Sequence, residues 1–342
     1  MTSRGNEVAG GTTRRRWLTG TLAAAATVIT KAPAIAQEQA PALKVERFAI
    51  WPGSPPGRPS AGVEDAFVKR RPDGDEDDIA WPHVATPMLT VVRPERPNGA
   101  AILIVPGGGY ARVALGRGGS DIARRFAASG VTAFELLYRL PHDGWGAGPD
   151  APLQDAQRAL RIIRAGAGAR WTVDPRRVAI AGFSAGGHLA ARAAARSALA
   201  TYEPLDAIDR HSAHADVAGL FYPVVTMLDE GVHRQSRAEL LGARQSELEA
   251  QRRWSAQLDL PSDMPPTFVC CNADDPVVPA ENSVQMYRAL HAAGIATELM
   301  IFEKGGHGPP SASKAHAQGG MGPFLWLDLF LAFAGGHGWP LA

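Results

Sequence analysis

The 342-residue sequence is poor in cysteine, in net charge and in long apolar runs, and each shortage excludes a class of protein. Its two cysteines, Cys270 and Cys271, are adjacent, which excludes a disulfide framework. Neighbours on a strand point to opposite faces, so we expect two small buried side chains and no metal pair. The formal net charge is only +1 and no long basic block occurs, so we expect no nucleic-acid partner. No apolar run reaches the roughly 20 residues that a membrane-spanning helix needs.

Residues 1–36 are predicted to be an export signal. Arg14 and Arg15 precede a short Ala/Thr-rich apolar run, and Ala34-Ile35-Ala36 has the small-x-small pattern of a cleavage site. The paired arginines resemble the address that the twin-arginine export machinery reads. We therefore expect a periplasmic or secreted protein with no stable membrane association after cleavage. An uncleaved membrane anchor is the alternative.

Two further segments differ in character from the rest of the chain. Residues 37–85 are rich in proline, glycine and acidic side chains, which predicts an irregular N-terminal extension. The acidic run at 73–78 has alternate carboxylates like a calcium loop but lacks its terminal glutamate and spacing, which favours a solvated loop. Residues 224–262 are polar and mostly helical in pattern, which predicts a small cap inserted over the carboxyl edge of a sheet.

Residues 86–342 are predicted to form an α/β domain. Short apolar, β-branched runs alternate with helical patterns, and this order is typical of a mainly parallel central sheet with helices on both faces. One such helix is expected between Ser120 as its N-cap and Gly130 as its C-terminal stop. Another, within 151–170, has Leu153, Leu160 and further apolar residues on one face.

Ser184 is the candidate nucleophile. Gly182-Phe183-Ser184-Ala185-Gly186 matches G-x-S-x-G and lies between an apolar strand pattern and an alanine-rich helix pattern. A turn this tight holds the serine in a strained conformation with its hydroxyl exposed, and only glycine-sized groups fit two positions before and after it. An ordinary turn serine is the alternative.

A serine hydroxyl needs a base, and the base needs a partner that orients it. His307, flanked by glycines after a predicted strand, is the candidate base, with a surface loop histidine as the alternative. Asp274 and Asp275 follow the preceding strand, and hydrolases with this turn place the acid between serine and histidine in the chain. We predict Asp275 as the acid and Asp274 as a loop-capping residue, and an exchange of these two roles remains open.

The glycines at 107–109 are candidates for an oxyanion hole. They end a strand, as the H-G-G-G loop of lipases does, although Pro106 stands in place of the histidine. The backbone N–H groups of Gly108, Gly109 and Ala185 are predicted to bind the oxyanion. A phosphate cradle is the alternative, but no lysine-serine or lysine-threonine pair follows the glycines.

Several other side chains are weaker candidates. Tyr110 and Trp145, on loops near the expected active edge, are predicted either to bind substrate or only to line the rim. His188 is expected to pack beneath the serine turn. His211, His214 and Asp216 include metal-ligand types, but their position just before a strand favours a loop.

Taken together, the motifs PGGGY, YRLP, DAQRALRIIR, VAIAGFSAGGHLA, DDPVVPAENS and FEKGGHG resemble the α/β-hydrolase superfamily over residues 88–334. Within it the sequence is similar to the small esterases related to acetylxylan and feruloyl esterases and to hormone-sensitive lipase. The resemblance implies hydrolysis of esters of acetylated or feruloylated carbohydrate by Ser184, Asp275 and His307, without a metal or organic cofactor. The sequence departs from relatives at 115–121, where they often carry a glutamate, and at 309–310, where they often carry an aromatic-glycine pair.

We therefore expect an exported serine carboxylesterase that acts through an acyl-enzyme on a small-molecule or oligosaccharide ester. Two alternatives remain at this point. One is a serine peptidase of the same fold. The other is a non-catalytic carbohydrate-binding module on a hydrolase-like scaffold.

Overall fold

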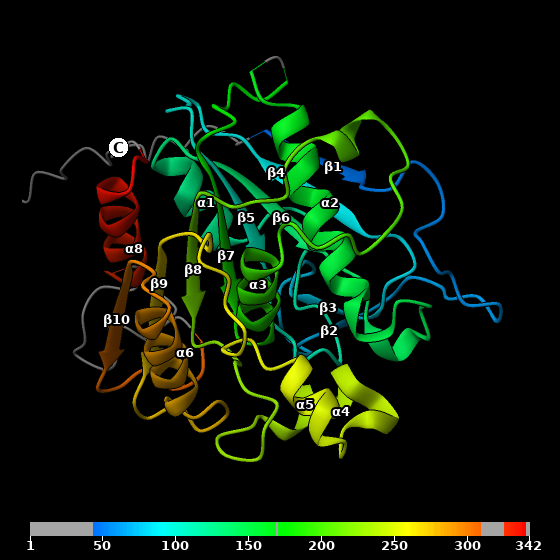
Figure 1. The fold of residues 1–342 in the computed structure, drawn as a ribbon. Coiled ribbons are helices and arrows are strands. Elements are labelled where there is room, and N and C mark those ends of the chain that lie inside the picture. Colours follow the sequence, from blue (N-terminus) through cyan, green and yellow to red (C-terminus); the bar gives the residue numbers. More distant parts are fainter. Residues whose placement is uncertain (1–43, 169, 309–324, 340–342) are drawn as a thin grey trace, which may run out of the picture. The chain divides into compact units, whose positions relative to one another are not determined.

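A computed structural model describes residues 44–168, 170–308 and 325–339 (Figure 1). The chain divides into two units, Met1–Pro41 and Ala42–Ala342, and everything below refers to the second. The predicted export signal lies outside the described residues. Among the described helices, none has the length and hydropathy needed to cross a bilayer.

An eight-stranded sheet forms the centre of this unit, with the strand order β1-β4-β6-β5-β7-β8-β9-β10. Its strands are β1 (Val45–Ala49), β4 (Met88–Val92), β5 (Ala101–Val105), β6 (Thr132–Leu137), β7 (Val178–Phe183), β8 (Val217–Phe221), β9 (Thr267–Asn272) and β10 (Thr297–Phe302). The strand β4 pairs antiparallel with both β1 and β6, and the pairs from β6 to β10 are all parallel. The mainly parallel sheet expected from the sequence is confirmed, and the carboxyl ends of its parallel strands share one edge.

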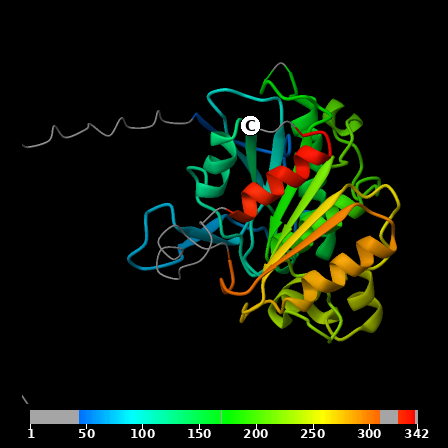
Figure 2. The ribbon, with the colours of Figure 1, turned by 90° about the vertical axis from the view of Figure 1, so that its left-hand side faces the viewer.

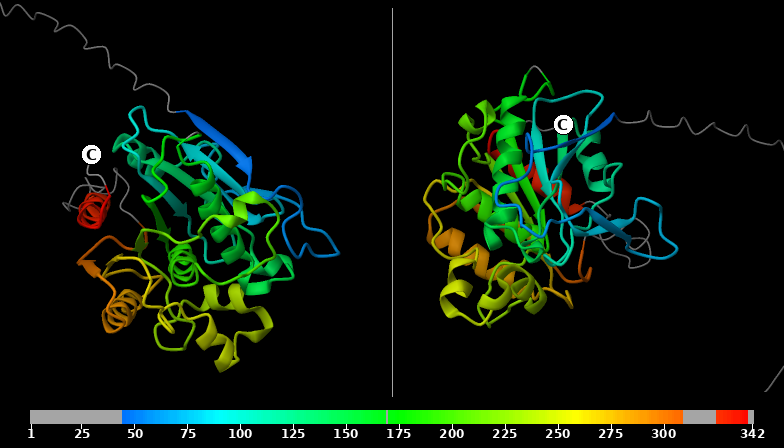
Figure 3. Two further views of the ribbon diagram at one scale, coloured as in Figure 1. Left: turned by 45° about the horizontal axis from the view of Figure 1, so that its top comes forward. Right: turned by 90° about the vertical axis from the view of Figure 1, so that its right-hand side faces the viewer.

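Helices cover both faces of the sheet. They are α1 (Asp121–Ala128), α2 (Ala151–Ala165), α3 (Ala185–Ala195), α6 (Glu281–Ala292) and α8 (Leu325–Gly336). Two more helices, α4 (Arg234–Leu241) and α5 (Leu248–Arg253), do not lie on a face of the sheet. Buried side chains of α2, α3 and α6 belong to one apolar cluster, and those of α1 and α8 to another. Figure 2 looks onto the face that carries α1 and α8, and the right panel of Figure 3 shows α8 behind the strands.

The predicted helix boundaries agree with the structure where capping residues marked them. Ser120 accepts a hydrogen bond from the N–H of Ala123 at 3.2 Å and begins α1, and Gly130 has a φ of +80° just after the helix. In α2 the predicted apolar face is fully buried, with Leu153 and Leu160 in the core.

The prediction that residues 37–85 are an irregular extension outside the domain is wrong for the part described. Their segment contributes β1 to the central sheet, and β2 (Ala66–Lys69) pairs with β3 (Ile79–His83) in a second, two-stranded sheet. A buried ion pair anchors the segment, because Asp155 accepts from Arg139 and also from the indole N–H of Trp51 at 2.8 Å. The domain therefore begins at β1 and not at residue 86.

The polar segment 224–262 is helical, as expected, and contains α4, η4 (Gly242–Arg244) and α5. Figure 1 shows α4 and α5 beyond the end of the sheet toward which the arrows of β8 and β10 point. These helices thus lie near the edge where the parallel strands end.

Candidate active site

Ser184 lies at the turn between β7 and α3, and its backbone has a φ of +55° and a ψ of −123°. This conformation is costly for a residue with a side chain and is found where neighbouring structure enforces it. The neighbours here are glycines for a steric reason. A Cβ at Gly182 would lie 2.2 Å from the carbonyl oxygen of Gly186, and one at Gly186 would lie 2.1 Å from that of Val105. The turn can therefore close only around glycine.

Ser184, His307 and Asp275 come together in one hydrogen-bond chain. The Oγ of Ser184 is 2.9 Å from Nε2 of His307, and Nδ1 of His307 is 2.8 Å from Oδ2 of Asp275. The three residues come from different loops, which follow β7, β10 and β9 at the same edge of the sheet. With Nδ1–H donated to the carboxylate, Nε2 is free to accept the serine proton.

Asp275 is held as an anion although its side chain is buried. Burial raises its pKa, but the hydrogen bond to His307 and the N–H groups of Val277 and Val278 outweigh that effect, and the net pKa is lowered. Asp274 has a different role, because its Oδ1 accepts the N–H groups of Gly305 and Gly306 at 2.9 and 2.8 Å. It therefore shapes the loop that carries His307, which is the capping role proposed from the sequence.

The glycine loop after β5 lies directly against Ser184, the candidate nucleophile. A Cβ at Gly107 would be 3.0 Å from the Cβ of Ser184, and one at Gly108 would be 1.9 Å from the carbonyl oxygen of Arg112. Gly108 and Gly109 have φ values of +140° and +68°. Ala185 is the first residue of α3, where backbone N–H groups have no partner within the helix. The predicted oxyanion donors therefore lie on two segments that meet at Ser184.

The expected rim position of Tyr110 and Trp145 is wrong, because both side chains are buried, with exposures of 1% and 3%. The Tyr110 hydroxyl is 2.8 Å from Nδ1 of His188, and the Arg139 guanidinium lies 4.8 Å from the centroid of the Trp145 ring. Tyr110 thus lies beneath the serine turn against His188, and Trp145 packs against Arg139 in the interior.

His188 packs beneath the serine turn, as expected. Its Nε2 is 2.6 Å from the carbonyl oxygen of Trp254, so Nε2 carries the proton and Nδ1 accepts from the Tyr110 hydroxyl. Burial lowers the pKa of His188 to about 3, with the nearby Arg192 guanidinium as the second cause, and the ring is neutral. This network joins the glycine loop, the nucleophile helix and the end of α5.

Two residues of the cap lie near the catalytic groups, and the sequence did not single them out. A side chain at Gly109 would begin 3.5 Å from Oε1 of Gln235 and 3.8 Å from Cε1 of His233. Nδ1 of His233 caps α4 by accepting from Ser236, which leaves Nε2 as its N–H. Burial and then the charge of His307 lower the pKa of His233. A histidine at the start of a helix in the inserted segment was the available sequence signal.

The remaining candidate residues from the sequence are buried or form hydrogen bonds and ion pairs that hold neighbouring segments together. Asp216 accepts from the N–H of Val178 and from Arg164, which ties the loop of His211 and His214 to β7. Cys270 and Cys271 are both buried thiols without a disulfide. In the acidic run, Asp78 pairs with arginines at 70 and 71.

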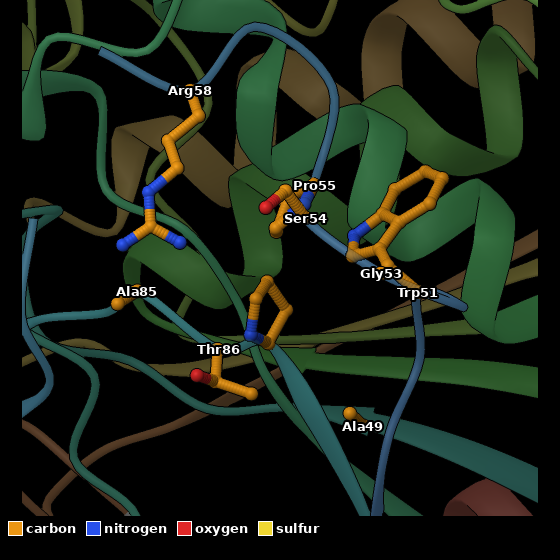
Figure 4. A pocket seen from close by; sticks show the side chains of 9 residues that line it. Ala49, Trp51, Gly53, Ser54, Pro55, Arg58, Ala85 and Thr86 are labelled. Carbon is orange, nitrogen blue, oxygen red and sulfur yellow. The ribbon is translucent and has the colours of Figure 1, made fainter. Parts of the chain in front are cut away.

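A separate hollow of about 230 Å³ lies in the N-terminal segment (Figure 4). It is lined by Ala49, Trp51, Gly53, Ser54, Pro55, Arg58, Ala85, Thr86 and Pro87. In Figure 4 the guanidinium of Arg58 extends toward Ala85 and Thr86. The hollow contains none of the candidate catalytic residues.

Comparison with known proteins identifies the family of the chain. The BD-FAE family model matches residues 91–290. An acetylxylan esterase of Xylanibacter ruminicola is 33% identical over 218 residues, which are 63% of this chain and 42% of that protein. The endo-1,4-beta-xylanase B of Butyrivibrio fibrisolvens is 31% identical over 227 residues, which are 65% of this chain and 34% of that protein. The match therefore spans less than half the length of either relative.

Solved structures give the same fold. The acetyl ester-xyloside bifunctional hydrolase of Caldicellulosiruptor lactoaceticus has a TM-score of 0.61 at 28% identity, over 78% of this chain and 89% of that one. A carboxylesterase of Lactobacillus plantarum has a TM-score of 0.57 at 23% identity, over 82% and 98% of the two chains, and supports the fold alone. The chain therefore has the α/β-hydrolase fold and belongs to the BD-FAE family, among relatives and structural neighbours that include carboxylic ester hydrolases.

Proposed function

We propose that this protein is an exported serine carboxylesterase that removes acetyl groups from carbohydrate through an acyl-enzyme. The hydrogen-bond chain from Ser184 through His307 to a buried, ionised Asp275 carries the proposal. A binding module has no need for a strained serine within hydrogen-bond distance of an oriented imidazole.

The proposed reaction proceeds in two halves. In the first, Nε2 of His307 takes the Ser184 proton while Oγ attacks the ester carbonyl, and the same imidazole then protonates the leaving alcohol. In the second, His307 activates water, which releases the acid and regenerates the serine. Backbone N–H groups of the glycine loop and of Ala185 stabilise the oxyanion in both halves, where each donor contributes roughly 10²–10³-fold in rate.

The substrate class rests on the relatives and on the cap. One protein to which the chain is similar is named an acetylxylan esterase, and another an acetyl ester-xyloside bifunctional hydrolase. Next to Gly109, Gln235 offers an amide and His233 an N–H, and such polar groups suit the hydroxyls of a sugar alcohol. Because of those names we favour acetyl over feruloyl as the acyl group that is removed. An assay that compares the hydrolysis of acetyl and feruloyl esters distinguishes the two.

Labelling with a fluorophosphonate and an ester panel test this function. Folded wild-type protein should form one adduct on Ser184 and should hydrolyse p-nitrophenyl acetate and acetylated xylo-oligosaccharides. Ser184→Ala should lose both properties, while Ser246→Ala, a change at an exposed serine, should keep them. Absence of an adduct on the wild type would favour the binding module, and turnover of aminoacyl anilides would favour the peptidase. Feruloyl esters cleaved faster than acetyl esters would overturn the acetyl assignment.

Export is proposed from residues 1–36 and is tested separately. Replacing Arg14 and Arg15 together with lysine should retain the protein in the cytoplasm of a bacterial host that has the twin-arginine pathway. Cell fractionation with an activity assay gives the measurement. Equal export of the wild type and the lysine variant would refute the twin-arginine route without affecting the esterase proposal.

A further inference from the structure

Two imidazoles and a carboxylate gather where the end of β3 meets the short helix η1 (Pro141–Asp143). His83, His142 and Asp143 each place one ligand atom so that all three atoms lie within 4.8 Å of one another. Oδ1 of Asp143 is 2.6 Å from Nδ1 of His83 and 3.7 Å from Nε2 of His142. These atoms converge from two chain segments that are far apart in sequence.

The cluster contains two carboxylates, and the only side chains paired with them among the described residues are the two imidazoles. The Asp143 carboxylate is buried, with a side-chain exposure of 1%, and only Oδ2 accepts a backbone N–H, that of Val84. Glu239 of α4 adds a second carboxylate, 3.2 Å from Nδ1 of His142. Among the described residues, no lysine or arginine forms an ion pair or hydrogen bond with either carboxylate.

Each ring nitrogen of His142 faces a hydrogen-bond acceptor. Its Nδ1 faces the carboxylate of Glu239, and its Nε2 is 2.9 Å from the carbonyl oxygen of Pro82. A neutral imidazole carries a single N–H, so it can satisfy only one of these acceptors. A second ring proton would satisfy both acceptors. A cation can instead take the place of the Nε2 proton, so that Nδ1–H donates to Glu239 while the lone pair of Nε2 binds the ion in exchange for the hydrogen bond to Pro82.

We propose that His83, His142 and Asp143 bind a zinc ion, with Glu239 orienting His142 from behind. Two imidazole nitrogens and one carboxylate oxygen are a donor set that Zn²⁺ uses, with the fourth tetrahedral position left to water. Zinc–ligand bonds of about 2.0–2.1 Å put neighbouring ligand atoms roughly 3.3 Å apart. The spacings from Oδ1 of Asp143 are 2.6 and 3.7 Å and no two of the three atoms are more than 4.8 Å apart, so zinc would replace the hydrogen bond between His83 and Asp143 after small shifts of the side chains. A carboxylate on the second nitrogen of a ligating histidine is the usual outer partner in such sites.

The ion would connect the cap to the body of the domain. Glu239 belongs to α4, whose first turn carries His233 and Gln235 beside Gly109. Zinc bound at His142 therefore strengthens a contact that holds this helix in place. This inference does not depend on ester hydrolysis, because none of the proposed ligands belongs to the catalytic chain.

Zinc titration of untagged, chelator-treated full-length protein tests the site, with binding measured by calorimetry or by competition with a chromogenic chelator. The wild type should bind one Zn²⁺ per chain at this site. His83→Ala and His142→Ala should each weaken binding at least tenfold, and Glu239→Gln about tenfold, as outer partners do. His211→Ala, which alters an exposed histidine elsewhere, should bind zinc like the wild type.

As a control for folding, the circular dichroism spectra and Tm values of the variants are compared with those of the wild type in the absence of metal. The His83 side chain is 53% exposed, but it is the hydrogen-bond partner of Oδ1 of the buried Asp143, so His83→Ala should keep the circular dichroism spectrum of the wild type and have a lower metal-free Tm. Each zinc-induced shift is therefore measured from the metal-free Tm of the same variant. Added zinc should raise the Tm of the wild type and of Ser184→Ala, but not that of His83→Ala. A wild type that binds no zinc, or a His83→Ala/His142→Ala protein that binds it equally well, would overturn the proposal.

Discussion

Replacing Glu135 with glutamine should stabilise the protein at neutral and alkaline pH. Glu135 lies on β6 with an exposure of 1%, and both carboxylate oxygens face the N–H of Ser120 at 3.2 and 3.1 Å. Burial raises the pKa of Glu135 from 4.5 to about 7, although the hydrogen bonds with Ser120 act in the opposite direction. The folded protein therefore carries a carboxyl group that resists ionisation.

The sign and size of the effect follow from linkage. Between pH 4.5 and 7 the unfolded chain loses this proton while the folded chain keeps it, so the free energy of unfolding falls as pH rises through that window. At about 1.4 kcal/mol per pH unit, the cost to the native state reaches about 3 kcal/mol above pH 7. Glutamine has no proton to lose, and its carbonyl oxygen can still accept from Ser120.

The assay compares unfolding of wild type and Glu135→Gln from pH 4 to pH 8, by heat or by guanidinium. The two proteins should be close in stability at pH 4, and the variant should gain up to about 3 kcal/mol at pH 8, or about 5 °C in Tm for a domain of this size. Glu95→Gln, at an exposed position, should show no such trend. A difference that does not change with pH, or one that favours the wild type at pH 8, would refute the reasoning.

Three further predictions concern the catalytic residues and their supports. Asp275→Asn should lower kcat for p-nitrophenyl acetate by about 10⁴-fold, because the amide orients the wrong tautomer of the catalytic histidine, while the Tm changes little. Tyr110→Phe should destabilise the fold by about 1–3 kcal/mol in a guanidinium titration, since Nδ1 of the buried His188 loses its donor; unchanged stability would mean that the bond is not formed. His233→Ala should raise KM for acetylated xylo-oligosaccharides several-fold and leave that for p-nitrophenyl acetate nearly unchanged, and equal effects on both would argue against contact with the sugar.

The hydrogen-bond chain of Ser184, His307 and Asp275 could be predicted from the sequence because each of its members has a local signature. Ser184 stands between glycines at a strand-to-helix junction, and His307 stands between glycines after a strand. These residues are far apart in the sequence. Parallel strands end at one edge of a sheet, however, so residues just after β7, β9 and β10 meet there. The glycine motifs therefore identified the residues, and the alternation of strands and helices identified the edge of the sheet at which they meet.

The N-terminal strands could not be predicted in the same way. β1 is an edge strand whose five residues are exposed or only partly buried, so it lacks the continuous apolar run that marked the central strands. Its place depends on pairing with β4 and on the buried contact between Trp51 and Asp155, which joins segments far apart in the chain. Such long-range partners leave no local pattern, and the glycine- and proline-rich residues between the strands concealed them.

The position of Tyr110 shows why proximity in sequence was a poor guide to the substrate contacts. The residue follows the glycine loop directly, but its φ of +60° and its hydrogen bond to His188 hold the ring inside the protein. The polar groups beside Gly109 come instead from the first turn of α4, in the inserted segment. The groups that would contact an alcohol thus lie on a different segment from those that activate the serine. If the proposed function holds, we expect changes in α4 to alter which alcohol is accepted while the chain from Ser184 to Asp275 keeps its geometry.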